Sequence, residues 1–132
     1  MSAALVLNCL RSIIRETRGI QYAILVVDNA SGGDDFEAIC TVFTKVIWIQ
    51  LEYNSGFARA NNEGIRRAKG QVILLLNPDT IVEGNAIEQC YRQFVQDNYV
   101  ACGVQLLNPD RTPQISGSYF VRGGLDFLRA LL

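Results

Sequence analysis

The stretch from Gln71 to Thr80, with the sequence QVILLLNPDT, constrains the fold most strongly. Its residues 72–76 form an unbroken apolar run that is too short to cross a bilayer and is typical of a strand covered on both faces. Pro78 has no backbone donor, so the strand should end before it and deliver Asp79 at its C-terminal end. In open α/β sheets, ligands bind at that edge. An ordinary turn is the alternative interpretation, because Asn, Pro and Asp all favour turns.

A second apolar run ends in the same way. Residues 22–27 are followed by Asp28 and then by a loop that contains two glycines. Two predicted strands thus end in acidic loops, which favours a ligand site over a chance turn.

Helical and strand-like patterns alternate along the rest of the chain. Amphipathic spacing predicts helices at residues 3–17, 36–43 and 86–95. A further helix is predicted to end at Gly70, and small residues at positions 58, 60 and 64 should let it lie close against the sheet. Strands are predicted at residues 22–27, 45–51, 72–76 and 99–104. This alternation predicts one α/β domain over residues 1–132, with a mostly parallel sheet between two layers of helices, a three-layer α/β/α architecture.

The C-terminal region holds a second Asn-Pro-Asp sequence, at residues 108–110. It lies between a short apolar run and the strand-like residues 112–121, so we expect a hairpin turn and no functional role for Asp110. Residues 125–132 are predicted to form a short apolar helical piece.

The amino-acid composition limits which kinds of catalytic and metal site the chain can form. The chain has 132 residues, 49% of them hydrophobic, and a net charge of -1, which argues against a broad basic surface for nucleic acid. It contains no histidine, so Ser-His or Cys-His catalysis and imidazole metal sites are excluded within it. Carboxylates must then supply the acid, base or metal chemistry, and Mg²⁺ or Mn²⁺ suits oxygen ligands.

Four cysteines lie far apart in apolar segments without a CxxC pair: Cys9, Cys40, Cys90 and Cys102. We expect them to be reduced core residues, which predicts a cytoplasmic protein without structural zinc. No secretion signal or membrane span is visible in the sequence.

Four ordered motifs carry a resemblance to a known family: VVDNASGGDD, NSGFARANNEGIRRAKG, VILLLNPDT and GVQLLNPDRTPQ. They resemble the nucleotide-sugar half of inverting family 2 glycosyltransferases of the GT-A fold, and within these the rhamnosyltransferase-like branch. The resemblance runs over nearly the whole chain. It implies a GT-A-like α/β fold and transfer of a sugar from a nucleoside diphosphate sugar donor, with inversion, to a saccharide or lipid-linked acceptor in polysaccharide biosynthesis.

The resemblance also implies roles for particular residues. Asp28 matches the acid that hydrogen-bonds the nucleotide base, with Asn29 and Ser31 beside it. The residues that match the N-x-G-x-x-R-x-x-N pattern of the nucleotide pocket are Asn54, Gly56, Arg59 and Asn62. Asn77 and Asp79 occupy the D-x-D-like metal motif. Because Asn replaces the first acid, Asp79 is implied to be the ligand of the Mg²⁺ or Mn²⁺ that bridges the diphosphate.

The chain departs from the family pattern at both ends. Family members usually begin with a central strand before the helix that opens this chain, and they continue with an acceptor half that carries the general base. We therefore expect a donor-binding portion without a catalytic base of its own, the base lying beyond Leu132, and no sugar transfer by this chain alone. A missing central strand would expose the edges of residues 22–27 and 72–76, so self-association is also expected. The full-length protein is expected to be cytoplasmic or peripheral at the inner face of the membrane.

Two alternatives stay open at this point. One is a non-catalytic nucleotide-binding or receiver-like regulatory module with Asp28 as the phosphorylatable acid, although receivers would need clustered acids and a lysine at a later strand end. The other is a structural fragment whose fold survives and whose function does not. Divalent-dependent binding of a nucleoside diphosphate separates the enzyme interpretation from both.

Overall fold

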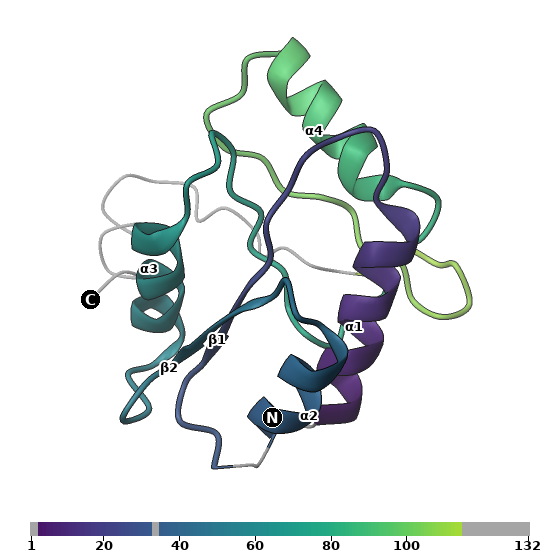
Figure 1. Ribbon diagram of the computed structural model, residues 1–132. Coiled ribbons are helices and arrows are strands. Elements are labelled where there is room, and N and C mark those ends of the chain that lie inside the picture. The colour runs from purple at the N-terminus through teal and green to yellow at the C-terminus, as the bar shows by residue number, and fades with distance from the viewer. Residues whose placement is uncertain (1–2, 33–34, 115–132) are drawn as a thin grey trace, which may run out of the picture. The chain divides into compact units, whose positions relative to one another are not determined.

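The computed structural model describes residues 3–32 and 35–114 (Figure 1). The chain divides into two compact units, residues 1–98 and 99–132. The elements of the first unit are α1 (Ala3–Glu16), β1 (Leu25–Asp28), α2 (Asp35–Val42), β2 (Ile47–Gln50), α3 (Phe57–Arg67) and α4 (Ala86–Gln96). No helix in the described part of the chain is long and apolar enough to cross a membrane.

The two strands pair in parallel, as the alternating pattern predicts. Leu25 lies opposite Ile47, and Asp28 lies opposite Gln50. The ladder extends past the last strand residue, because the backbone N–H of Leu51 donates to the carbonyl oxygen of Asp28 at 2.9 Å. The C-terminal ends of β1 and β2 therefore meet at one edge, and the loops that follow them start side by side.

The core of the first unit forms where α1 and α2 pack together. Val6, Leu10 and Ile39 are almost fully buried there, with exposed fractions of 2%, 3% and 0%. The partly buried residues packed against them are Leu7, Ile24, Val26, Phe43, Val46 and Trp48. The apolar stripe of α1 thus meets both α2 and the β1–β2 pair, which confirms the predicted amphipathic helix at the start of the chain.

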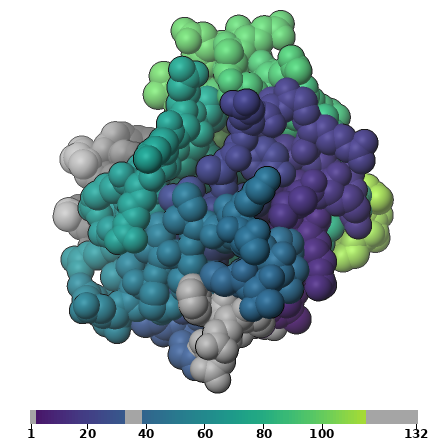
Figure 2. All heavy atoms as spheres, viewed as in Figure 1, coloured from purple at the N-terminus to yellow at the C-terminus, as the bar shows by residue number. Residues whose placement is uncertain are grey.

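Helix α3 packs closely against β1. Ala60 is buried, and a side chain added at Gly64 would come within 3.1 Å of Cγ2 of Val27. Small residues at these two positions permit the close approach, as predicted. Ala58 is exposed, so the prediction is wrong for that position. On the face drawn in Figure 2, the atoms of α3 adjoin those of the β2 segment.

Two predicted strands, residues 72–76 and 99–104, are not strands in the structure. Ile73, Leu74 and Leu75 are 44%, 47% and 54% exposed, although their pattern predicts a buried central strand. The physical reason is the lack of a partner: among the described residues, no neighbouring strand offers these segments backbone donors and acceptors. An apolar run favours extended backbone, but the hydrogen-bond ladder of a sheet needs a second strand.

The predicted hairpin turn in the second unit is confirmed. Leu107 and Pro113 form an isolated antiparallel bridge, and the N–H of Gln114 donates to the carbonyl oxygen of Leu106 at 2.8 Å. The predicted continuation of strand 112–121 beyond residue 114, and the predicted helix at 125–132, lie outside the described residues.

All four cysteines are free thiols. Cys9 is buried and Cys40 and Cys90 are partly buried, but Cys102 is exposed. The prediction of a core position is therefore wrong for Cys102, which lies within the unpaired segment 99–104.

Candidate functional site

Asp28 ends β1 and is buried, with 4% of the residue exposed. Its Oδ1 accepts a hydrogen bond from the backbone N–H of Ser31 at 3.1 Å and another from the Ser31 hydroxyl. Ala30 adopts a φ of 56°, a left-handed conformation that turns the chain back so that Ser31 reaches Asp28. Burial raises the pKa of Asp28, but the bonds from Ser31 and Gln50 together hold the pKa below its ordinary value. The carboxylate is thus ionised and is held both by its own loop and by Gln50 of β2.

Gln50 is a site residue that the sequence analysis misses. Its Nε2 donates to Oδ2 of Asp28 at 2.9 Å, and its Oε1 accepts from the indole N–H of Trp48 at 3.1 Å. These two bonds fix which way the Gln50 amide points. A signal was present, since Gln50 lies near the end of the apolar run at 45–51 as Asp28 follows the run at 22–27, and parallel neighbours place such residues side by side.

Amide side chains join the loops after β1 and β2. Asn29 donates from Nδ2 to Oδ1 of Asn54 at 2.9 Å, and Oδ1 of Asn29 accepts from the backbone N–H of Ser55 at 2.8 Å. Oδ1 of Asn54 also accepts from the backbone N–H of Gly56 at 3.0 Å. Gly56 has a φ of 83° and directly precedes α3, so this amide clamp also sets where α3 begins.

We expect Asn29→Ala to destabilise the chain by about 1–2 kcal/mol, because it removes the clamp and leaves the Ser55 N–H without its acceptor. The shift in the midpoint of urea unfolding measures this loss. Asn62→Ala is the matched control. The Asn62 side chain is exposed and has no hydrogen bond to any described residue, so this change should cost nothing or stabilise α3 slightly. Equal effects of the two substitutions would contradict a structural role of the clamp.

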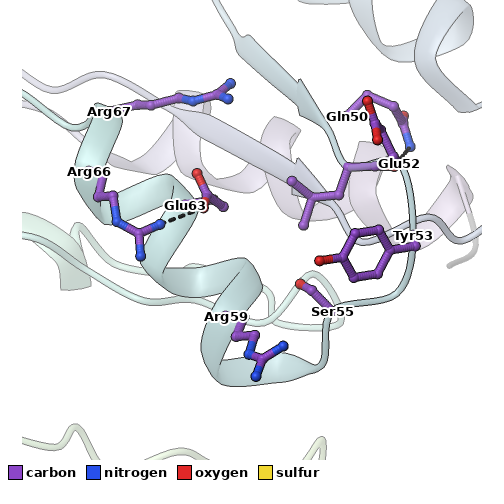
Figure 3. Close-up of a pocket in the computed structure, with 9 residues that line it drawn as sticks. Gln50, Glu52, Tyr53, Ser55, Arg59, Glu63, Arg66 and Arg67 are labelled. Carbon is purple, nitrogen blue, oxygen red and sulfur yellow. Dashed lines mark hydrogen bonds and ion pairs between the residues drawn. The ribbon is translucent and has the colours of Figure 1, made fainter.

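A pocket of about 470 Å³ lies between α3 and the segment that follows β2 (Figure 3). Its volume falls within the roughly 300–1,000 Å³ range of small-molecule sites. Arg59, Glu63, Arg66 and Arg67 form the α3 wall, and the opposite wall consists of Gln50, Leu51, Glu52, Tyr53 and Ser55.

Three arginines and two glutamates line the pocket, which gives it a net positive charge on a chain whose net charge is -1. Arg66 forms an ion pair with Glu63, as the dashed line in Figure 3 marks. Arg59 and Arg67 have no hydrogen bond or ion pair to any described residue, so their donors face the pocket and solvent. Such a pocket can accept an anion, and a guanidinium is well suited to phosphate.

The structure thus brings together most, but not all, of the predicted site residues. The clamped loops contain Asp28, Asn29, Ser31, Asn54 and Gly56. Arg59 lines the pocket, which adjoins these loops because Gln50 and Ser55 also line it. Asn62 lies on α3 but does not line the pocket. Asn77 and Asp79 do not line it either.

Asn77 and Asp79 instead lie beside α1. The thiol of Cys9 is 3.9 Å from the carbonyl oxygen of Asn77, and the pKa of that thiol is raised first by burial and second by the charge of Asp79. The N–H of Thr80 donates to the same carbonyl at 3.2 Å, so residues 77–80 form a turn. The interpretation as a turn is therefore correct for the backbone, and it leaves both side chains exposed.

The chemistry of this turn fits a hard divalent cation only in part. The exposed Asp79 carboxylate makes no hydrogen bond or ion pair with the described residues, and the Asn77 amide oxygen is equally accessible. Carboxylate and amide oxygens suit Mg²⁺ or Mn²⁺. Among the described residues, however, no three His, Cys, Asp or Glu side chains group together to hold a metal. Oxygens of a bound substrate would have to complete such a site.

Comparison with known proteins places the chain in a family. The family described as "Glycosyl transferase family 2" matches residues 2–129. The chain belongs to glycosyl transferase family 2. Membership of family 2 implies a GT-A-like α/β fold, with which the parallel β1–β2 pair and its flanking helices agree.

Three curated relatives carry names of glycan-synthesising enzymes. Glycosyltransferase GlyG of Streptococcus pneumoniae serotype 4 is 31% identical over 124 residues, which cover 91% of this chain and 40% of the relative. An N-acetylglucosaminyltransferase of Azorhizobium caulinodans is 28% identical over 65% of this chain and 23% of the relative. Chondroitin synthase of Pasteurella multocida is 25% identical over 88% of this chain and 12% of the relative. This family 2 chain thus spans 40% or less of each of the three, and no solved structure matches it.

Proposed function

We propose that this chain is the donor-binding part of a glycosyltransferase that transfers a sugar from a nucleoside diphosphate sugar to a saccharide or lipid-linked acceptor. Membership of family 2 supports the transfer chemistry. The observation that carries the proposal for this chain is the amide clamp, which joins the loops after β1 and β2 next to the arginine-lined pocket. Inversion at the sugar, the rhamnosyltransferase-like branch and a place at the cytoplasmic face of the membrane belong to the same proposal.

Base recognition is proposed for the loop after β1. The two oxygens of Asp28 already accept three hydrogen bonds, two on Oδ1 and one on Oδ2. A carboxylate has about four acceptor positions, so one position on Oδ2 is left for a base N–H. Asn29 and Ser31 hold the loop in shape, and Gln50 presents Asp28 in a fixed orientation.

Phosphate binding is proposed for the start of α3. Arg59 faces the pocket one turn into the helix, and Asn54 and Gly56 set the direction of that first turn. A helix N-terminus favours a negatively charged group, and a guanidinium adds donors that match phosphate oxygens. Asn62, one turn further along α3, completes the proposed set on this side.

Asn77 and Asp79 are proposed to hold a Mg²⁺ or Mn²⁺ ion together with the donor diphosphate. When bound, a divalent ion neutralises the charge that the nucleoside diphosphate acquires as leaving group. The residues of this chain contribute one carboxylate and one amide oxygen, so little metal affinity is expected without the nucleotide.

The receiver-like alternative gains no support from the geometry. A receiver needs several acids grouped at the strand end, whereas among the described residues no three His, Cys, Asp or Glu side chains group together. No observation favours this second function.

A thermal-shift panel of UDP, dTDP and GDP, each with Mg²⁺ or with EDTA, tests the proposed function. A ligand that binds only the folded state raises the apparent stability, and a nucleotide at a hundred times its Kd contributes about 2.7 kcal/mol. We expect at least one nucleotide to raise the melting temperature, and to raise it further with Mg²⁺. Equal melting temperatures with and without every nucleotide would contradict donor binding.

A further inference from the structure

Ser12 of α1 makes a buried hydrogen bond to a segment far away in the sequence. Its Oγ accepts from the backbone N–H of Val82 at 2.9 Å and donates to the carbonyl oxygen of Cys9, in its own helix, at 2.7 Å. Ser12 is 3% exposed and Val82 is 5% exposed. Because the Ser12 hydroxyl donates its hydrogen bond to the Cys9 carbonyl oxygen, it accepts the Val82 N–H with a lone pair, and these two bonds fix the orientation of the hydroxyl.

This bond lies just beyond the turn that carries Asp79. Val82 follows Asp79 by three residues, and on the other side of Asp79 the thiol of Cys9 lies 3.9 Å from the carbonyl oxygen of Asn77. Helix α1 therefore contacts the chain on both sides of Asp79, one turn of α1 apart.

In the described part of the chain, no strand fixes the position of Asp79. Residues 72–76, which lead into the turn, form no ladder with the described residues, and Ile73, Leu74 and Leu75 are about half exposed. The strand that should deliver Asp79 at a sheet edge is thus not what fixes it. The contacts with α1 fix the position of Asp79 instead, and the Ser12–Val82 hydrogen bond is shorter and more buried than the contact of Cys9 with Asn77.

We propose that Ser12 is a positioning residue for Asp79, and that its bond to Val82 holds the turn so that the Asp79 carboxylate meets a divalent cation bound to the donor diphosphate. This inference rests on the proposed function. Removing a group that orients a metal ligand typically lowers metal affinity about 10–100-fold. Because the hydrogen bonds of Ser12 go to Cys9 and Val82 and to neither Asp28 nor Arg59, binding of the nucleotide without metal should not change.

The test uses the 132-residue chain with Ser12→Ala and Ser12→Thr, which keeps the hydroxyl. Ser12→Cys, which keeps the size but offers only a weak sulfur acceptor, replaces the alanine variant if that fails to fold. Ile39→Val is the control, because Ile39 is 0% exposed in the core between α1 and α2 and its truncation lowers stability without touching the turn. Two quantities are measured for each: hydrogen exchange of the Val82 amide, and the affinity for a nucleoside diphosphate in Mg²⁺ and in EDTA.

We expect Ser12→Ala to speed Val82 exchange and to reduce the gain in affinity from Mg²⁺ by about tenfold or more, with the affinity in EDTA unchanged. Ser12→Thr should restore both, and Ile39→Val should leave the Mg²⁺ gain intact. A wild-type chain that gains affinity from Mg²⁺ while Ser12→Ala gains just as much would overturn the positioning role. A wild-type chain without any Mg²⁺ gain would instead overturn the metal part of the proposed function, and the inference with it.

Discussion

Asp79→Ala is expected to abolish the metal-dependent part of nucleoside diphosphate binding, so that the affinity in Mg²⁺ falls to the affinity measured in EDTA. The reason is that Asp79 is the carboxylate of the proposed site, and the described residues provide no cluster of acids that could replace it. Mg²⁺ keeps much of its water shell and is usually held by one or two carboxylates and phosphate oxygens, so the loss of one carboxylate removes most of the protein's contribution.

The chain supplies its own control for this experiment. Asp110 stands in a second Asn-Pro-Asp sequence, but its Oδ1 accepts from the N–H of Thr112 at 3.0 Å and from the Thr112 hydroxyl at 2.6 Å. These bonds lower the pKa of Asp110, and they show that its carboxylate stabilises the turn. Asp110→Ala should therefore leave the Mg²⁺ gain unchanged. Metal-dependent binding that survives in Asp79→Ala, or that is lost equally in Asp110→Ala, refutes the assignment of Asp79.

Asp28→Asn is expected to weaken nucleotide binding about tenfold or more, and to weaken binding of inorganic diphosphate much less. The substitution removes the charge while keeping the shape, and a hydrogen bond to a charged group contributes about 1.5–3 kcal/mol. Calorimetric titrations of both ligands measure the two losses. If they are equal, Asp28 serves only to hold Ser31 and Gln50 in place, and base recognition lies elsewhere.

The same substitution has a stability effect with a defined pH dependence. The pKa of Asp28 is lower in the folded chain than its ordinary value, so the ionised carboxylate stabilises the fold above the unfolded pKa of about 3.9. This contribution is lost as the pH falls through the folded pKa. Wild type should therefore be more stable than Asp28→Asn near pH 7, and the difference should shrink below about pH 4. Urea midpoints across this range measure the difference, and a gap that stays constant would show that Asp28 has the same pKa in the folded and the unfolded chain.

The sequence predicts the local structure well where a segment has its partners nearby. Helix α1 follows from the spacing of Val6 and Leu10, and the β1–β2 pair follows from two apolar runs joined by a short helix. The site loops could be predicted because glycine, asparagine and aspartate at strand ends form turns with few alternatives. The hydrogen bond between Asn29 and Asn54 is a finding of the structure, because the resemblance implied only that each residue belongs to the nucleotide site.

The failures have a common physical cause, which is dependence on distant partners. The run at 72–76 specifies extended backbone, but whether it becomes a strand depends on a neighbour that the run itself cannot encode. Gln50 was missed because its role comes from its register opposite Asp28, which only pairing reveals. The bond between Ser12 and Val82 spans 70 positions, and no local pattern indicates it. Self-association through the free strand edges stays a prediction.

The central claim is that the loops after β1 and β2 bind a nucleoside diphosphate with the help of a divalent ion. Calorimetric titration of the 132-residue chain with UDP, dTDP and GDP, in Mg²⁺ and again in EDTA, tests it most directly. We expect saturable binding of at least one nucleotide at one site per chain, tighter in Mg²⁺ than in EDTA. If a chain that is folded by circular dichroism binds none of the three nucleotides in Mg²⁺, these loops are not a nucleoside diphosphate site.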